Sequence, residues 1–558
     1  MFKVANFSNM MKALSRRQKL LSATNRGSLE HCITCIQLVM LSLSATIGAG
    51  QYSVPGFVIQ YTGPAVIFSY LITGLCCFFT AFPYAEMAGR VKGTGFSYSY
   101  IYTCYGEIFG YIGGQLLTFV SFVGIACCSR GWADCLAGFL KIFGINLTPW
   151  VYEIEIFNGA IILNPLACVI IVCLSVLVLQ GMKDSAAINN AVATLNCVII
   201  AFAIITGLIY TRSEHLSGFF DKGLHGIMQG AGLAFFGYQG FETVTCFTEE
   251  AQDPNKDMPF VLTTSLSLLI AFNVLLSFVM AGMAPPWVMD NSESLIATFR
   301  YATNPFITTV IAFGSIVTLV ANDFALILEQ PRIFYAMAKD GMLANVLAST
   351  NAKKVPEFAT ILTAVISCVF ALILPVDVLG EAAALACLII SSIVDLGVVI
   401  LRYEHPKNQP YLTYLCLAFL GLSFFAGFSF QHSLPDGVMW GVLWLLINMI
   451  ILVACQKQRN FPSNYICPGL PYIPMFGALT FMFITGTVTT ISWILVIGYQ
   501  LLVIPIYFFY SINHSMLSKE TALDANIIEK SLRRSQYLNK SFEEYEPQEQ
   551  MIEFKHIG

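Results

Sequence analysis

Charged and titratable residues are scarce in this sequence. Only 11% of its 558 residues are Asp, Glu, Lys or Arg, and 7 are His. The formal net charge of −4 says nothing about a nucleic-acid partner, and we predict none. In contrast, 56% of the residues are hydrophobic and the mean hydropathy is +0.71. This composition excludes an ordinary soluble domain and predicts a polytopic protein embedded in a lipid bilayer.

Patterns typical of metal sites and catalytic centres are also missing. One Cys-x-x-C pair, Cys32 and Cys35, has no second pair near it that would complete a zinc site. The sequence has no G-x-S-x-G elbow and no phosphate-binding loop. Most of the 17 cysteines lie in apolar runs, where they behave as small hydrophobic residues. We therefore expect no metal, no cofactor and no catalytic residues, and a membrane enzyme is the least favoured class.

Long apolar runs make up most of the chain. Windows of about 20 apolar residues predict an all-α fold with fourteen transmembrane helices. These are 34–61, 63–88, 108–140, 161–181, 188–210, 226–248, 260–283, 305–330, 358–375, 380–402, 410–430, 438–455, 472–488 and 492–513. The predicted domains are a polar N-terminus (1–30), a fourteen-helix membrane domain (31–515) and a polar C-terminal tail (516–558), which we expect to be largely disordered or a short surface helix.

The distribution of Lys and Arg predicts the orientation. Counted alternately from the N-terminus, segments on one side of the membrane hold 24 of these residues and loops on the other side hold 4. The positive-inside rule then places both termini in the cytoplasm. One sequon, at Asn146, falls outside, and the Pro149 that follows it argues against glycan occupancy. We expect the plasma membrane, with a lysosomal or other endomembrane location left open.

The first apolar run contains a cluster of helix-breaking residues, Thr46-Ile47-Gly48-Ala49-Gly50-Gln51-Tyr52-Ser53-Val54-Pro55-Gly56. Three glycines and a proline are poor helix formers. A broken helix is tolerated at membrane depth only where it is buried in protein or lines a cavity. The cluster indicates either a discontinuous helix with free amides and carbonyls, or a close contact between helices that needs small residues.

The sixth apolar run carries a second cluster, Phe235-Phe236-Gly237-Tyr238-Gln239-Gly240-Phe241-Glu242. The two runs occupy equivalent positions if two five-helix halves repeat with inverted topology. Interrupted spans at matching positions are the best sequence indication of a transport site. Together the clusters favour a transporter over simple helix packing.

Two pairs of opposite charges stand four residues apart within apolar helices. Glu86 and Arg90 lie in the second run, and Arg130 and Asp134 in the third. A charge at mid-membrane costs about 2.5–3.5 kcal/mol on insertion scales, so each needs a partner or a function. At i,i+4 spacing each pair can form an ion pair on one helix face, and we expect structural pairs close to the headgroups, with a gating role as the alternative.

Several motifs resemble the cationic amino acid transporters of the amino acid–polyamine–organocation superfamily, over roughly residues 31–515. They are Thr46–Gly50, Gly63-Pro64, Tyr84-Ala85-Glu86, Gly89-Arg90-Val91, Thr94-Gly95, Gly106-Glu107, Gly240-Phe241-Glu242, Glu249-Glu250, Asp253-Pro254, Pro331-Arg332, Ala336–Gly341, Ile400–Tyr403, Pro468–Pro471 and Tyr510–Ser515. None is specific alone, but the set is specific to the family, whose fourteen helices agree with the predicted number.

The resemblance implies two inverted five-helix repeats, with helices 1 and 6 discontinuous, followed by four further helices. The substrate carboxylate would bind amides of Ile47, Gly48, Ala49 and Gly50, and its ammonium would bind carbonyls near Thr46 and between Phe236 and Phe241. The implied site also includes Gly237 and Glu242. Phe236, Tyr238 and Phe241 would close over the ligand, with core packing as the alternative for each. Glu107 would be a structural or gating acid at the cytoplasmic side.

The sequence departs from the family pattern in ways that bear on ion coupling. Family members usually carry Ser-Thr-Ser in helix 8, where this chain has Val320-Ala321-Asn322. Sodium-coupled relatives use these hydroxyls to complete a cation site, so we expect no sodium coupling. Proton-coupled relatives place a Lys in helix 5, where this chain has the neutral Asn196. These departures predict uniport or exchange.

The substrate is less constrained. The Ala-Gly-Glu run that usually follows the glycine loop is replaced by Pro55-Gly56-Phe57. Asp323, Glu329 and Asp395 add acids that the pattern lacks, and Asp323 is our candidate partner for a cationic substrate head. We expect arginine, lysine or ornithine, with neutral amino acids second. A non-transporting amino acid sensor is the alternative from another class. The sequence does not determine protein partners.

Overall fold

The computed structural model describes residues 33–91, 96–152, 154–156, 161–181, 186–248, 251–289, 293–351, 355–403, 409–432, 436–458, 460 and 465–516. The predicted N-terminal segment 1–30 and nearly all of the tail 516–558 lie outside these residues, as do Cys32, Thr94-Gly95 and Glu249-Glu250.

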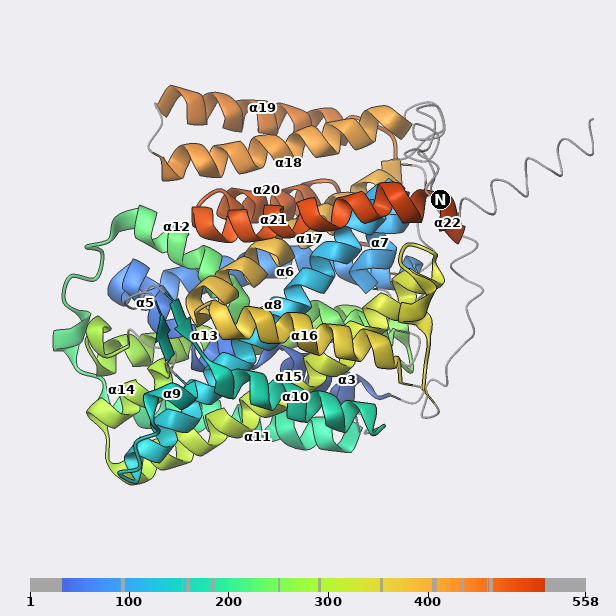
Figure 1. The fold of residues 1–558 in the computed structure, drawn as a ribbon. Helices are drawn as coiled ribbons and strands as arrows, with labels where there is room; N and C mark the ends of the chain where they lie inside the picture. The colour runs from blue at the N-terminus through green and yellow to red at the C-terminus, as the bar shows by residue number, and fades with distance from the viewer. Residues whose placement is uncertain are drawn as a thin grey trace, which may run out of the picture.

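The described chain is almost entirely helical (Figure 1). Its α-helices are α3 (Cys35–Thr46), α4 (Ala49–Tyr52), α5 (Pro55–Thr62), α6 (Val66–Arg90), α7 (Phe96–Tyr105), α8 (Glu107–Ile142), α9 (Pro149–Tyr152), α10 (Pro165–Leu179), α11 (Ala186–Tyr210), α12 (Gly223–Ala234), α13 (Pro254–Met283), α14 (Ser294–Ala302), α15 (Pro305–Lys339), α16 (Glu357–Ile373), α17 (Val376–Tyr403), α18 (Gln409–Gln431), α19 (Asp436–Ala454), α20 (Tyr472–Thr485), α21 (Thr490–Ile506) and α22 (Ile512–His514).

Shorter elements connect these helices. They are the 3-10 helices η1 (Gly63–Ala65), η2 (Ser213–Leu216), η3 (Phe235–Gly237), η4 (Phe241–Phe247), η5 (Pro286–Val288) and η6 (Asn345–Ala348), the π-helix η7 (Tyr507–Ser511), and one antiparallel hairpin of β1 (Ile154–Ile156) and β2 (Ile161–Leu163).

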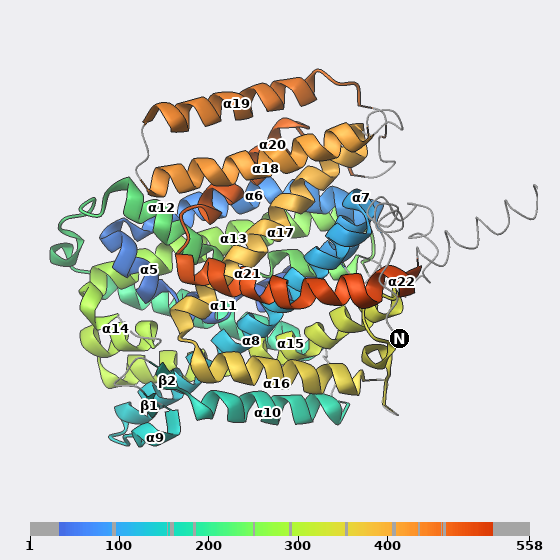
Figure 2. The ribbon, with the colours of Figure 1, turned by 45° about the horizontal axis from the view of Figure 1, so that its top comes forward.

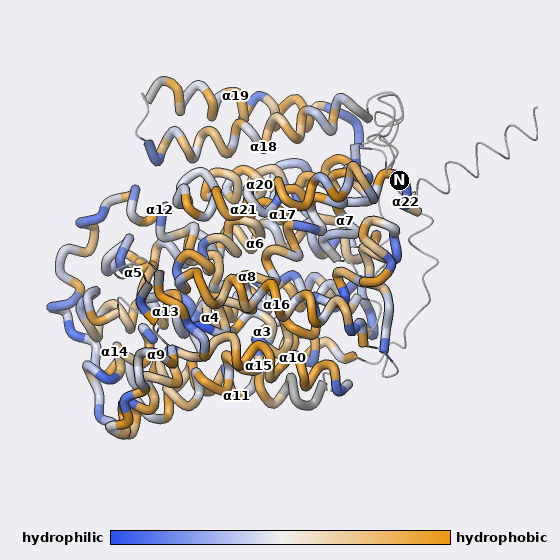
Figure 3. Tube along the Cα trace, in the orientation of Figure 1, coloured by the Kyte–Doolittle hydropathy of each residue, from blue (hydrophilic) through white to orange (hydrophobic). Residues whose placement is uncertain are grey.

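Within the described residues, eight helices are long and apolar enough to cross a membrane. Five shorter apolar helices accompany them. Each of the fourteen predicted ranges contains helix, which agrees with a polytopic membrane protein, while the number of spans and the inverted repeat stay predictions. Figure 3 shows hydrophobic residues along the helices and hydrophilic residues gathered toward their ends, the pattern that a bilayer imposes.

Two helices form the centre of the molecule. In their most apolar stretches, α8 is 94% buried and α17 is 89% buried, whereas α21 is 22% buried. α8 packs against α15, α17, α16 and α7. The helices α8 and α17 therefore line the interior of the protein, whereas α21 lies at its periphery.

The last helices form a layer at one side of this bundle. In Figures 1 and 2, α18 and α19 lie outermost, and α20 lies between them and the bundle in Figure 1. α20 contacts both α17 and α18. These three helices correspond to the predicted ranges 410–430, 438–455 and 472–488.

Three α-helices lie wholly outside the predicted ranges: α7, the four-residue α9, and α14. α7 has the sequence FSYSYIYTCY, in which Tyr and Ser are poor helix formers, and it is too short to span a membrane. α14 is nine residues long and its first six residues are buried. Tertiary packing rather than intrinsic propensity stabilises such elements.

Candidate functional site

The first membrane segment is interrupted, as the sequence predicts. α3 begins at a capping box, in which the Thr34 hydroxyl accepts from the amide of Gln37, and ends at Thr46. Ile47 and Gly48 are extended, with φ,ψ of −76°,108° and −161°,−139°. We call Ile47–Gly48 the first break. The helix resumes as α4 and again at Pro55, a residue suited to the first position of a helix.

The sixth segment is interrupted as well. α12 ends at Ala234 and continues as the 3-10 turn η3, and the chain reverses its helical sense at Gly240, where φ is 104°. We call Tyr238–Gly240 the second break. A Cβ on Gly240 would lie 2.7 Å from the carbonyl oxygen of Ala45, so this position requires glycine for its conformation and for its space.

The two interrupted helices contact each other directly. A Cβ on Gly50 would lie 2.6 Å from Cα of Gly237 and 2.7 Å from the carbonyl oxygen of Phe236. Gln51 Nε2 donates to the Gly237 carbonyl at 2.6 Å, and Asn273 Nδ2 donates to the same oxygen at 2.9 Å. The small residues therefore serve close packing and interruption together, and the two sequence interpretations are not exclusive.

The expected cluster of four free amides is only partly open. The Ile47 amide donates to Leu43 O at 2.9 Å, and the Gly48 amide donates to Gln51 Oε1 at 2.8 Å. Gly50 is the second residue of α4, so its amide has no acceptor within that helix. The sequence could not show this difference, because it depends on where the Gln51 side chain folds back.

The carbonyls at the first break bind a side-chain amide. Asn322 Nδ2, from α15, donates to Ala45 O and to Ile47 O, both at 3.3 Å. Cys128 Sγ, from α8, donates to Asn322 Oδ1 at 3.3 Å and orients the amide. Sequence reasoning missed this role of Asn322, although an amide in place of the family's hydroxyls was the signal for it.

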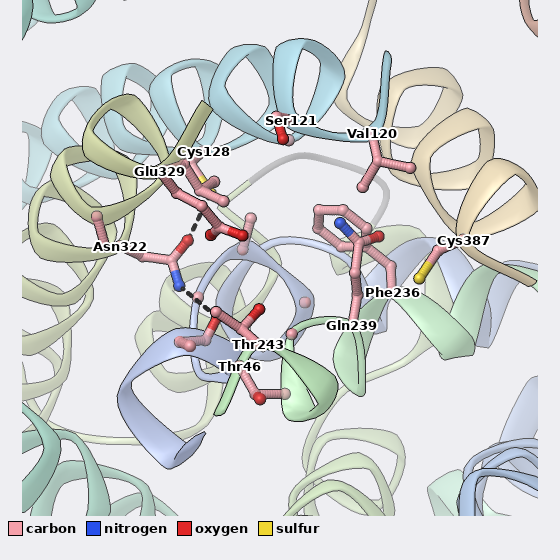
Figure 4. Close-up of a pocket in the computed structure, with 18 of the residues that line it drawn as sticks. Thr46, Val120, Ser121, Cys128, Phe236, Gln239, Thr243, Asn322, Glu329 and Cys387 are labelled. Carbon is pink, nitrogen blue, oxygen red and sulfur yellow. Dashed lines mark hydrogen bonds between the residues drawn. The ribbon is translucent and has the colours of Figure 1, made fainter. Parts of the chain in front are cut away.

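A cavity of about 70 Å³ lies between the two breaks and the long helices α8, α15 and α17 (Figure 4). Its lining residues are Ala45, Thr46, Gly48, Ala49 and Gly50 from the first segment; Phe236, Gln239, Gly240, Glu242 and Thr243 from the sixth; Leu117, Val120, Ser121, Gly124 and Cys128 from α8; Asn322, Ala325, Leu326 and Glu329 from α15; and Cys387 and Ile390 from α17.

Six predicted substrate-binding residues line this cavity, and five do not. The six are Thr46, Gly48, Ala49, Gly50, Phe236 and Glu242; the others are Ile47, Gly237, Tyr238, Phe241 and Asp323.

Two of the three predicted gate aromatics belong to the packed core instead. The Tyr238 hydroxyl donates to Tyr70 O at 2.7 Å, and the ring is fully buried. Phe241 is also fully buried and packs 6.1 Å from the ring of Tyr84. Phe236 alone of the three lines the cavity. The direction in which each ring points depends on the backbone conformation of the 3-10 turns η3 and η4, which the sequence alone does not reveal.

The acid predicted to meet the substrate faces another way. Asp323 accepts a hydrogen bond from Ser129 Oγ of α8 and is buried there. Its neighbour Asn322 and the later Glu329 line the cavity. Adjacent residues point about 100° apart on a helix, so the choice between positions 322 and 323 depends on how α15 is rotated.

The cavity is lined by two acids together with neutral polar and apolar residues. Among the described residues that line it, Glu242 and Glu329 are the charged ones, and none is Lys, Arg or His. Glu242 Oε2 accepts from the amide of Gly240 at 3.2 Å, and Cys387 Sγ donates to its Oε1 at 3.3 Å. The Glu242 carboxylate thus binds a backbone amide of the second break, two residues before it in the chain.

Comparison with known proteins agrees with this geometry. The amino acid permease family matches residues 33–455, about three quarters of the chain. The chain belongs to the amino acid permease family.

Relatives of this permease have transport functions in their names. A vacuolar cationic amino acid transporter 4 of Arabidopsis thaliana is 27% identical over 91% of this chain and 97% of its own length. A methylthioribose transporter of Bacillus subtilis is 26% identical over 81% of this chain and 99% of its own length. The branched-chain amino acid permease BcaP of the same bacterium is 25% identical over 90% and 98%. The predicted family and the prediction of a transporter rather than an enzyme are confirmed.

The predicted pair of Glu86 and Arg90 is present in this permease, and it is buried within the protein. Arg90 Nη2 lies 2.9 Å from Glu86 Oε1, and Glu86 is fully buried. Arg402 from α17 donates to both Glu86 oxygens, at 2.9 and 2.8 Å, and the Cys467 amide donates at 2.8 Å. Glu86 therefore joins α6 to α17 and to the chain before α20. Sequence reasoning missed Arg402, which lies 316 residues away.

The other predicted gating residues have structural partners. Arg130 donates to Leu374 O and Ile162 O, and thereby ties α8 to the end of α16 and to β2, while Asp134 accepts from Asn164 Nδ2 at 3.4 Å. Glu107 is the buried first residue of α8 and accepts from the Tyr507 hydroxyl at 3.4 Å.

Asn196 and Asn146 differ in their surroundings. Asn196 Oδ1 accepts from the Thr318 hydroxyl, which connects α11 to α15 beside the first segment. Asn146 is exposed in the connection between α8 and α9. Its glycosylation stays a prediction.

Proposed function

We propose that this permease carries amino acids across the membrane by alternating access, without sodium, and that its substrates are the cationic amino acids arginine, lysine and ornithine. One observation carries the proposal: two interrupted helices meet at a cavity whose only charged lining groups, in the described part of the chain, are carboxylates.

The ends of the interrupted helices suit the two ends of an amino acid. Gly50 near the start of α4 lines the cavity, and its backbone amide has no acceptor within that helix. Thr46 ends α3, whose carboxyl end has partial negative charge. A substrate carboxylate would bind near Gly50, and a substrate ammonium near the carbonyls at Thr46 and the second break.

Asn322 supports independence from sodium. An ion at the first break would need the oxygens of Ala45 and Ile47, and both already accept hydrogen bonds from the Asn322 amide. The amide connects α3 to α15 without an ion. Inward movement of a cationic substrate would instead use the membrane potential, worth about 2.3 kcal/mol per charge per 100 mV.

We further propose that both termini are cytoplasmic and that the protein works in the plasma membrane. The 24-to-4 distribution of Lys and Arg supports this orientation. Some relatives are named vacuolar or chloroplastic, so an internal membrane is the alternative location for this chain.

Neutral amino acids are the second candidate substrates. Leu117, Val120, Leu326 and Ile390 give the cavity an apolar wall that suits an aliphatic side chain. A relative named for branched-chain amino acids matches 90% of this chain, about the same share as the vacuolar cationic amino acid transporter, which matches 91%.

The test is uptake into liposomes that contain the purified full-length protein. Radiolabelled arginine, lysine and leucine are offered in sodium and in choline buffer, with and without an inside-negative potential. We expect arginine and lysine uptake that sodium does not change and that the potential increases. Uptake of leucine alone would show that the substrates are neutral amino acids. Uptake that depends on sodium would contradict the role of Asn322. Binding of amino acids without uptake would indicate a sensor.

A further inference from the structure

Glu329 is only partly buried, and this sets it apart from acids such as Asp323 and Asp395, which are buried inside the described membrane helices. It lies on α15 seven residues after Asn322, which is about two helical turns, so both side chains are on the same face. Both line the cavity, and Figure 4 shows the Glu329 carboxylate pointing into it.

The buried acids have protein donors. Glu86 binds two arginines, Glu381 accepts from Thr489 and Ser492, Asp395 accepts from Thr80, Asp323 accepts from Ser129, and Glu242 accepts from Gly240 and Cys387. Within the described ranges, no group donates a hydrogen bond to Glu329 and no base lies within ion-pair distance of it.

A nearby base does not take this role. Arg332 is one turn further along α15, is exposed, and does not line the cavity. A carboxylate inside a membrane protein is costly unless it faces a cation or a water-filled path. Glu329 is therefore placed to receive a charged group that enters the cavity from outside.

We infer that Glu329 binds the distal ammonium or guanidinium of the substrate side chain and sets the preference for cationic over neutral amino acids. The inference rests on the proposed function, because it takes the two breaks as the site of the substrate's α-carboxylate and α-ammonium. Asn322 contacts the first break, and Glu329 is about 10.5 Å further along the same helix face, so a long side chain extends toward it.

Glu242 has a different task at this site. Its two oxygens are held by the second break's own amide and by Cys387, which makes it a part of the wall. The planar, forked guanidinium suits a carboxylate with both oxygens free, and a point-like ammonium also suits it.

Citrulline provides a sharp test, because it has nearly the shape of arginine but a neutral head. Wild-type protein and E329Q are compared in liposomes for the ratio of arginine to citrulline transport, measured as kcat/KM. The ratio does not depend on how much protein folds. We expect it to fall at least about tenfold in E329Q, since a charge-assisted hydrogen bond is lost.

Matched variants separate charge from structure. E329D keeps a carboxylate and should retain most of the preference, whereas E329M removes the charge with a side chain of similar length and should lower the ratio as E329Q does. D323N removes a buried acid from the same helix outside the cavity and should leave the ratio unchanged.

The outcomes distinguish the two proposals. If the wild-type protein transports arginine and E329Q and E329M keep its preference over citrulline, Glu329 is not the head-group residue although the proposed function stands. If the wild-type protein transports neither arginine nor any other cationic amino acid, the proposed substrate class fails first. A ratio that falls equally in D323N would assign the effect to α15 as a whole.

Discussion

The side-chain amide of Gln51 connects the two interrupted helices: its nitrogen donates to the carbonyl of Gly237 at 2.6 Å. Its oxygen accepts from the amide of Gly48 at 2.8 Å. One side chain thus satisfies a free amide of the first segment and a free carbonyl of the sixth, at a depth where water cannot replace it.

Replacing Gln51 should therefore impair stability and transport together. Q51A leaves the buried Gly48 amide without its acceptor, at about 1–3 kcal/mol, while the Gly237 carbonyl keeps its hydrogen bond from Asn273. Q51E keeps the acceptor for Gly48 but turns a carboxylate oxygen toward the Gly237 carbonyl, so its effect should be at least as large as that of Q51A. Thermal unfolding in detergent and arginine uptake in liposomes measure both. A Q51A protein with unchanged melting temperature and uptake would contradict this role.

Changing Asn322 to Asp should create a requirement for a cation. The carboxylate of N322D would face the carbonyl oxygens of Ala45 and Ile47, which now accept from the amide at 3.3 Å. Three oxygens around one point repel each other unless a cation sits between them.

The measurement for N322D is arginine uptake in sodium against choline buffer, with the wild-type protein in both. We expect little uptake by N322D in choline and a recovery of about tenfold in sodium, equivalent to about 1.4 kcal/mol. Equal uptake in the two buffers at the wild-type rate would show that this amide does not replace an ion.

A methyl group at the contact between the segments should abolish transport. In G50A the new Cβ would lie 2.6 Å from Cα of Gly237, where only backbone can give way. G421A is the matched control, since a Cβ there meets nothing within 4 Å in α18. The control should fold normally and gain up to about 1 kcal/mol from helix propensity. Uptake by G50A equal to that by G421A would show that the contact is dispensable.

Breaking the buried ion network should destabilise the protein far more than breaking an exposed pair. E86Q leaves Arg402 buried with a weakened partner, and removal of one member of a buried pair costs about 3–5 kcal/mol. K256A removes the exposed pair with Asp253, in which the Lys side chain is 85% exposed, and should change stability by less than about 1 kcal/mol. Melting temperatures of the two purified variants compare these effects, and similar values would contradict the distinction.

Much of the architecture follows from the order of the residues. Apolar runs of membrane length place the helices, since backbone groups in lipid must bond within the segment. The glycines at positions 48, 50, 237 and 240 indicate where two of these helices are interrupted, because local propensity acts within a few residues. The ion pair of Glu86 and Arg90 follows from i,i+4 spacing alone.

Only the tertiary structure decided which polar groups face the cavity. Spacing fixes the relative angles of Asn322, Asp323 and Glu329 around α15, but the rotation of that helix against α8 and the first break makes 322 and 329 face inward and turns 323 away. Likewise, Arg402 reaches Glu86, and Gln51 reaches Gly237, across 316 and 186 residues. Such partners depend on how distant helices pack, and the periodicity of a single helix carries no information about its neighbours.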